Sequence, residues 1–90
     1  LTNTAGATTN AGQLNGGASI TGGTFTQTAG GVSGGLIHSA TVNANGGALD
    51  GAIGNSGTFT VGGTVTSANG FTNNALGMLT INAAGHYTIG

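Results

Sequence analysis

Six residue types are missing from this chain: cysteine, proline, lysine, arginine, glutamate and tryptophan. Without cysteine the chain can build neither a disulfide framework nor a thiolate metal site. Without lysine and arginine it lacks the cationic patch that supplies most nucleic-acid affinity, so we expect no nucleic-acid partner. No apolar run approaches the roughly 18 residues of a membrane-spanning helix, and we expect no membrane span. Because the chain starts at Leu1 without a charged leader, we expect a mature segment of a longer protein.

Glycine, threonine, alanine and asparagine dominate what is present, with 21 glycines among the 90 residues. Such a composition is compatible with disorder, but disordered chains usually combine low hydrophobicity with high net charge. Here the apolar share is 37% and the formal net charge is −1. The apolar residues are also regularly spaced, so we expect a folded chain.

Residues 53–72 show the spacing most clearly, because Ile53, Phe59, Val65 and Phe71 fall six residues apart. Threonine often follows such a position, and glycine or asparagine fills the intervals, which is typical of short strands joined by tight corners. Extended in both directions with steps of four to seven residues, the rhythm predicts an inward-facing series. Val61, Leu79 and Ile89 lie two residues from a member and share its face, so only Leu36 and Met78 fall outside the pattern. The series is Leu1, Ala7, Leu14, Ile20, Phe25, Val32, Ile37, Val42, Leu49, Ile53, Phe59, Val65, Phe71, Leu76, Ile81 and Tyr87.

Taking every third member sorts the whole series into three columns. The first is Ala7, Phe25, Val42, Phe59, Leu76; the second is Leu14, Val32, Leu49, Val65, Ile81; the third is Leu1, Ile20, Ile37, Ile53, Phe71, Tyr87. Steps near 17 residues within a column predict an all-β, three-faced parallel β-solenoid (β-helix) of about five turns. We expect residues 1–90 to form a single solenoid segment, part of a longer repeat array or filament.

Threonine and asparagine flank the first column and predict a flat polar face. The expected face consists of Thr24, Thr26, Thr41, Asn43, Thr58 and Thr60. Flat threonine arrays on β-solenoids resemble those of ice-binding proteins, and threonine also simply suits an exposed strand. Because Ala75 and Gly77 flank Leu76, we expect the array to stop before the last turn.

Residues that could do chemistry are few. We expect His38 and His86 to point outward from the third column, roughly 14 Å apart along the coil, too far to share a metal or a proton. Residues 45–53 are faintly similar to a calcium-binding nonapeptide, but Asp50 has no stacked partner aspartates. The letters of Gly51 to Gly57 match a phosphate-binding glycine pattern without the helix it requires. We therefore expect no catalytic, metal-binding or cofactor-binding residue, no cofactor and no enzymatic activity.

The same sequence pattern occurs near both ends of the chain, and it is shared with a known group of proteins. In LTNTAGATTNAGQLNGGASITGG and FTNNALGMLTINAAGHYTIG the corresponding residues are Leu14, Asn15, Ile20, Thr21, Gly23 and Ile81, Asn82, Tyr87, Thr88, Gly90. These segments resemble the Gly/Asn/Thr-rich β-helical repeats of bacterial autotransporter passengers and filamentous-haemagglutinin-like surface proteins. The resemblance implies a right-handed β-helix. A rhythm near six residues is also similar to that of left-handed β-helices; we favour the right-handed coil.

The same resemblance implies secretion to the bacterial cell surface and a structural or adhesive role. Expected partners are neighbouring solenoid rungs, copies of the chain end to end, and a host or abiotic surface. The alternative is a self-assembling, functional-amyloid-like filament subunit, favoured by low charge, absent proline and open strand edges. An ice-binding solenoid is a third alternative.

Overall fold

Short strands and the corners between them make up residues 1–89, which are the residues that the computed structural model describes. In chain order the strands are β1 (Thr2–Asn3), β2 (Ala7–Asn10), β3 (Gln13–Leu14), β4 (Ala18–Ile20), β5 (Thr24–Gln27), β6 (Gly31–Val32), β7 (Leu36–His38), β8 (Thr41–Ala44), β9 (Gly47–Leu49), β10 (Ile53–Asn55), β11 (Thr58–Val61), β12 (Thr64–Ser67), β13 (Phe71–Asn73), β14 (Met78–Ile81) and β15 (His86–Ile89).

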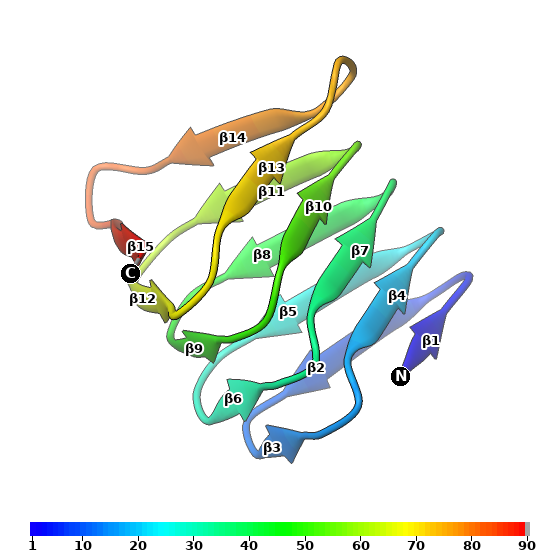
Figure 1. The fold of residues 1–90 in the computed structure, drawn as a ribbon, viewed down its shortest axis with the longest axis horizontal. Helices are drawn as coiled ribbons and strands as arrows, with labels where there is room; N and C mark the ends of the chain where they lie inside the picture. Colours follow the sequence, from blue (N-terminus) through cyan, green and yellow to red (C-terminus); the bar gives the residue numbers. More distant parts are fainter. Residues whose placement is uncertain (90) are drawn as a thin grey trace.

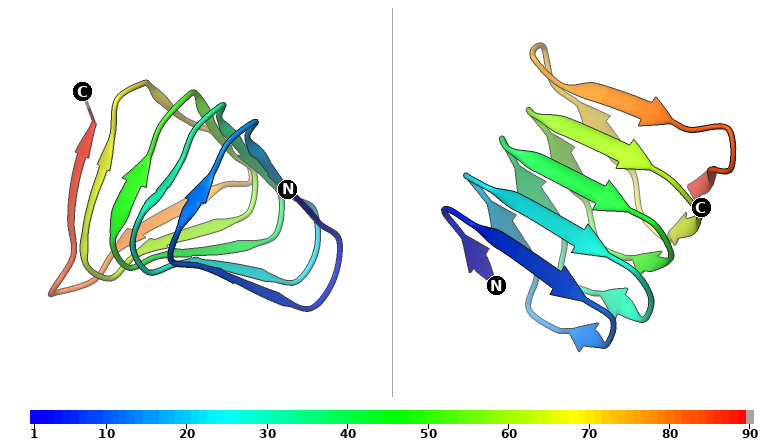
Figure 2. Two further views of the ribbon diagram at one scale, coloured as in Figure 1. Left: turned by 90° about the horizontal axis from the view of Figure 1, so that it is seen from below. Right: turned by 180° about the vertical axis from the view of Figure 1, so that it is seen from behind.

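The strands form three five-stranded sheets in which every third strand pairs (Figure 1). Sheet A contains β1, β4, β7, β10 and β13; sheet B contains β2, β5, β8, β11 and β14; sheet C contains β3, β6, β9, β12 and β15. All pairs are parallel. The view in the left panel of Figure 2 shows the three walls enclosing one interior. The predicted three-faced parallel solenoid of about five turns is confirmed.

The coil is right-handed, as we favoured. In Figure 1 the strands of sheet A run up and to the right in front, those of sheet B run back behind them, and successive turns advance to the upper left. This is the hand that crossover connections between parallel strands adopt almost without exception, because right-twisted strands feed it.

One column of the core follows the sequence periodicity closely. Phe25, Val42 and Phe59 are equally spaced in the sequence, pair in register on neighbouring strands, and are each fully buried. Around them the interior is filled by other buried apolar side chains: Ile20, Val32, Leu36, Ala44, Leu49, Ile53, Val61 and Val65.

In β7 the inward residues are not those expected. Ile37 is 69% exposed, whereas Leu36 is 1% exposed and pairs with Ala18 and Ile53. Pairing with these two buried residues turns Leu36 inward, one residue earlier than the rhythm suggested, after a corner of two glycines with positive φ, Gly34 and Gly35. Since side chains alternate along a strand, this shift turns every side chain of β7 to the opposite face of sheet A.

The last turn is longer than the others. Thr24, Thr41 and Thr58 pair in register at equal spacing along the chain, and the same spacing would bring Ala75 next, yet Thr58 pairs with Met78. A turn in which the Gly77 N–H donates to the Asn74 carbonyl oxygen at 2.9 Å accommodates the added length. As a result Leu76 lies in this turn, 86% exposed, and Leu79 takes the column position above Phe59.

Further column assignments were wrong. Ala7 is exposed and its neighbour Thr8 pairs with Phe25. Ile20 is buried as expected, but it pairs with His38. In the second half of the chain, Val65 pairs with Gly47 rather than Leu49, Ile81 belongs to sheet B opposite Val61, and Tyr87 belongs to sheet C opposite Val65. Each difference follows from corner lengths, which set register and vary from turn to turn.

Where sheet A turns into sheet B, backbone stacks directly on backbone. A Cβ added at Gly57 would overlap the Ala40 carbonyl oxygen of the turn below. Inside this corner Asn55, fully buried, donates from Nδ2 to Asn73 Oδ1 at 2.7 Å and to the Met78 carbonyl oxygen at 2.9 Å. Its Oδ1 accepts the Gly57 N–H at 3.1 Å. One amide therefore ties two consecutive turns together.

Candidate functional site

The outer face of sheet B brings the six predicted face residues together. Their parallel register places Thr24, Thr41 and Thr58 in one row along the coil, and Thr26, Asn43 and Thr60 in a second row. Strand geometry sets about 4.8 Å between neighbours within a row and roughly 6.6 Å between rows. All six side chains are half-buried. Among the described residues, no protein group hydrogen-bonds to any of the six side chains, so they can bond to a ligand or to water.

The second row extends further than the sequence suggested. Thr9 pairs with Thr26 at one end, and Thr80 pairs with Thr60 at the other. The expectation that the array stops before the last turn is therefore wrong for this row, since β14 begins at Met78 and not near Leu76. The first row does end in apolar groups, with Ala7 beside Thr24 and Met78 beside Thr58. The face is a polar grid with one complete row of five residues.

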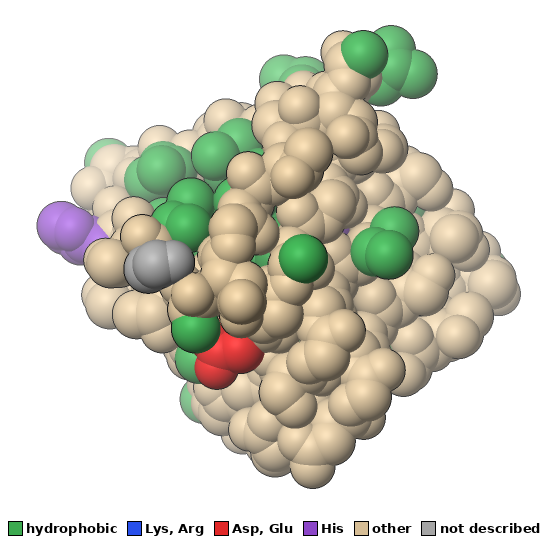
Figure 3. Space-filling model, in the orientation of Figure 1, with side chains coloured by type: hydrophobic (Ala, Val, Ile, Leu, Met, Phe, Trp, Pro, Cys, Tyr) green, Lys and Arg blue, Asp and Glu red, His purple; other side chains and the backbone are tan. Residues whose placement is uncertain are grey.

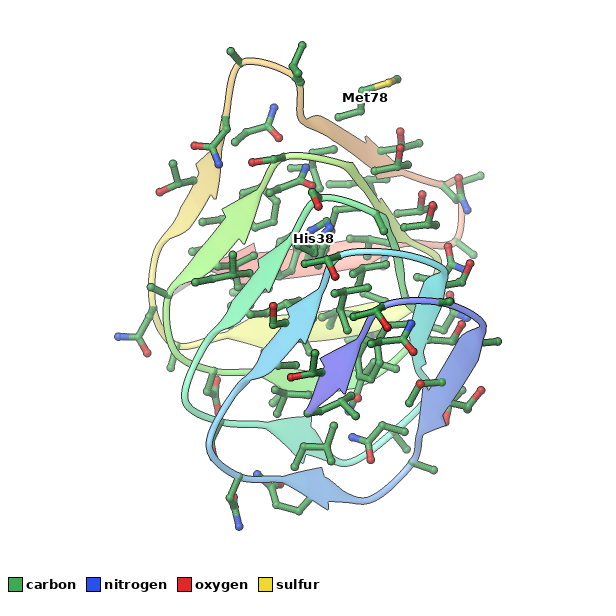
Figure 4. All side chains as sticks on the ribbon, turned by 90° about the vertical axis from the view of Figure 1, so that its right-hand side faces the viewer. His38 and Met78 are labelled. Atoms are coloured by element: carbon green, nitrogen blue, oxygen red, sulfur yellow. The ribbon has the colours of Figure 1, made fainter. Side chains whose placement is uncertain are left out.

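His38 lies inside the coil, not on its surface as expected (Figure 4). It follows buried Leu36 by two residues and so shares the inward face of β7. The imidazole Nδ1 lies 3.2 Å from the Ala40 carbonyl oxygen, and the ring centroid lies 5.7 Å from that of Phe59. Within the described residues, Nε2 has no hydrogen-bond partner.

Burial lowers the pKa of His38 below its ordinary value, because the charged form loses its hydration; the hydrogen bond to the Ala40 carbonyl opposes this to a smaller extent. The other histidine, His86, is exposed on β15 in sheet C and pairs with Thr64. The two histidines therefore lie on different walls, one inside and one outside. No shared site between them is possible.

Asp50 acts as a corner residue. Its Oδ1 accepts the Ala68 N–H at 3.0 Å, and the neighbouring Gly51 N–H donates to Asn69 Oδ1 at 3.1 Å. These bonds link the corners of two consecutive turns. Over residues 1–89 no three His, Cys, Asp or Glu side chains gather as a metal site would require.

A shallow groove on the outer face of sheet A was not anticipated. It has a volume of about 430 Å³, with a floor of glycine backbone from the corners at Gly16, Gly17, Gly34 and Gly35. The exposed side chain of Ile37 forms part of its wall. The sequence signal that could have revealed it is the pair of adjacent apolar residues in β7, of which only one can face inward.

No protein-family model, curated protein or solved structure matches the chain. The described residues contain no helix long and apolar enough to cross a membrane.

Proposed function

We propose that this chain is a structural and adhesive segment of a bacterial extracellular surface protein or fibre. One observation carries the proposal: a single apolar core is enclosed by three parallel sheets, and the chain around it is rich in hydroxyl, amide and glycine groups, with one acidic residue and no lysine or arginine. Figure 3 shows one small acidic patch and no lysine or arginine on the face in view, with separate apolar side chains and a histidine among the polar groups.

The arrangement suits a rod that bears load and makes many weak contacts. Hydrogen bonds between parallel strands run along the coil axis, so extension of the rod would have to break whole ladders at once. The polar grid presents its free hydroxyl and amide groups in a regular plane. Contacts through such groups are not screened by salt as ion pairs are.

Adhesion can be measured directly with beads that carry the chain. We expect retention under flow on an abiotic surface or on host cells that exceeds that of beads carrying a blocking protein. Retention should change by less than about twofold between low salt and 1 M NaCl, because no charged pair is involved. Retention equal to the blocking-protein control would overturn the proposal.

Ice binding is a second candidate, favoured by the complete row from Thr9 to Thr80 on a flat parallel sheet. Recognition of a crystalline surface needs regularly spaced groups, and four of the five residues in this row are threonine, with Asn43 as the fifth. A freezing assay should then show thermal hysteresis that the double substitution Thr26→Leu and Thr60→Leu abolishes. The matched control, Thr64→Leu with Thr66→Leu on the exposed face of sheet C, should retain it. Absence of hysteresis in the unmodified chain would remove this candidate.

A self-assembling filament is the remaining alternative. It draws support from unpaired strand edges at both ends of all three sheets within the described residues. Filament growth requires the exposed strand edges of one copy to pair with those of the next.

A further inference from the structure

His38 occupies the core near the middle of the coil. Its strand, β7, is the central strand of sheet A, and the side chain is 1% exposed. Ile20 and Asn55 take the same position on the two neighbouring strands, and the Phe59 ring centroid lies 5.7 Å from that of the imidazole. The imidazole is therefore surrounded by apolar and amide groups and shielded from water (Figure 4).

The neutral imidazole is the form that this site accommodates. Nδ1 lies 3.2 Å from the Ala40 carbonyl oxygen, which can only accept a hydrogen bond, so Nδ1 carries the hydrogen. Nε2 then holds the lone pair, and it has no partner among the described residues. A second proton on the ring would give Nε2 an N–H without an acceptor and would place a full charge in the core.

No acidic group lies where it could compensate that charge. The strands packed against β7 and its imidazole are β4, β10 and β11, and none of them contains a titratable residue. Asp50, the one acidic residue, lies in a corner between sheets C and A. The other titratable groups of the described chain, the Leu1 amino group, His86 and Tyr87, lie outside these strands. A protonated His38 is therefore stabilised only by leaving the core for water.

Only two residues separate His38 from the polar grid. β7 ends at His38, and β8 begins at Thr41, the middle residue of the first row, and also carries Asn43, the middle residue of the second. The Ala40 carbonyl oxygen, which faces the imidazole, also accepts the Thr58 N–H at 3.0 Å. The corner that keeps the imidazole inside therefore also fixes the positions of grid residues on two strands.

We propose that His38 makes adhesion through the polar grid dependent on pH. Uptake of a proton at Nε2 moves the imidazole out of the core, opens the corner between β7 and β8, and disrupts the regular plane of the grid. This regulation rests on the adhesive role proposed above.

The direction of the effect follows from solvation. Below 6.5, the ordinary pKa of histidine, the proton favours the open corner, because the imidazolium is more stable in water than in the core. Turns farther along the coil contact this corner only through its neighbours, so they stay folded while it opens. A return to neutral pH removes the proton and restores the grid.

The bead assay for adhesion measures the effect at a surface. Retention of the unmodified chain should be at least about fivefold lower at pH 5 than at pH 7.5, and it should recover on return to pH 7.5. His38→Gln takes up no proton and should retain the beads equally at both pH values, as should His38→Leu, a second variant that does not titrate. The matched control, His86→Gln, changes the exposed histidine and should lose retention as the unmodified chain does. Equal decreases in His38→Gln and His86→Gln would overturn the inference.

A second measurement does not require adhesion. Amide hydrogen exchange, expressed relative to the urea-unfolded chain at the same pH, reports the corner through Ser56 and Thr58, whose N–H groups donate to the His38 and Ala40 carbonyl oxygens. Protection of both amides should fall at least about fivefold between pH 7.5 and 5 in the unmodified chain and in His86→Gln, and stay constant in His38→Gln. Constant protection in the unmodified chain would overturn the inference even if the beads adhere. Reduced protection in a chain that adheres at neither pH would instead refute the adhesive role and leave the acid-opened corner established.

Circular dichroism at the two pH values separates a local opening from unfolding. The strand signal of the unmodified chain at pH 5 should match that at pH 7.5, because one corner opens while the three sheets persist. Loss of the strand signal at pH 5 would show that the whole coil unfolds, and it would overturn the inference of a local switch.

Discussion

Replacing Asn55 with alanine tests how far buried amides stabilise the coil. The substitution removes three hydrogen bonds, to Asn73 Oδ1, to the Met78 carbonyl oxygen and from the Gly57 N–H, all within one fully buried site. At about 1 kcal/mol per bond the free energy of unfolding should fall by about 3 kcal/mol. For a chain of this size that corresponds to a decrease in Tm of roughly 12–24 °C.

Urea unfolding followed by circular dichroism gives the measurement. The matched control is Asn74→Ala, which removes one exposed bond to Ser56 Oγ at 2.8 Å and should cost less than about 0.5 kcal/mol. Asn55→Leu restores the side-chain volume but leaves the same partners unpaired, so it should be no more stable than Asn55→Ala. A cost for Asn55→Ala within about 0.5 kcal/mol of the control would refute the reasoning.

Three further predictions follow from the core and the corners. The pKa of His38 is lowered in the folded chain, so on acidification the unfolded chain binds this proton first. The free energy of unfolding should therefore decrease as the pH falls below 6.5, the ordinary pKa of histidine, and should level off below the pKa of the folded chain. Urea midpoints between pH 7.5 and 5 should show this decrease in His86→Leu but a smaller decrease in His38→Leu, and equal decreases would contradict it. Gly57→Ala should cost about 1–3 kcal/mol, because its Cβ would meet the Ala40 carbonyl oxygen. Gly54→Ala, on a strand with open space at the Cβ, should be neutral or stabilising by up to about 1 kcal/mol in the same unfolding assay, and a similar cost for both would argue against tight corner stacking. A screen against common esterase and glycosidase substrates should show no turnover, and turnover of any of them would refute a purely structural role.

Residues 24–61 illustrate how much of the fold the sequence predicted. Phe25, Val42 and Phe59 recur at a constant step, with threonine or asparagine on either side, and the structure stacks them in one buried column. The polar grid was predictable for the same reason, since alternation along a strand is a local property of the backbone. Three sheets, parallel pairing and about five turns all followed from this regular part of the chain.

The errors concentrate where two residues suit the same position or where a corner changes length. Leu36 and Ile37 are both apolar, and only pairing with Ile53 decides that Leu36 faces inward. His38 then follows Leu36 into the core by alternation. The sequence does hold a signal for this arrangement, because the step from Leu36 to Ile53 equals the step between Val42 and Phe59, but the six-residue rhythm obscured it.

The sequence by itself determined the repeating unit, because strand alternation and glycine corners are encoded within a few neighbouring residues. Only the tertiary structure decided register in the last turn, where added corner residues move Leu79 into the column in place of Leu76. It also decided that Thr8 and Asn10, and not Ala7, take the column positions beside Phe25 and Gln27, where they hydrogen-bond to Asn3 and Gln27. Register depends on contacts between residues about a turn apart, and the free energy of those contacts cannot be read from local pattern alone.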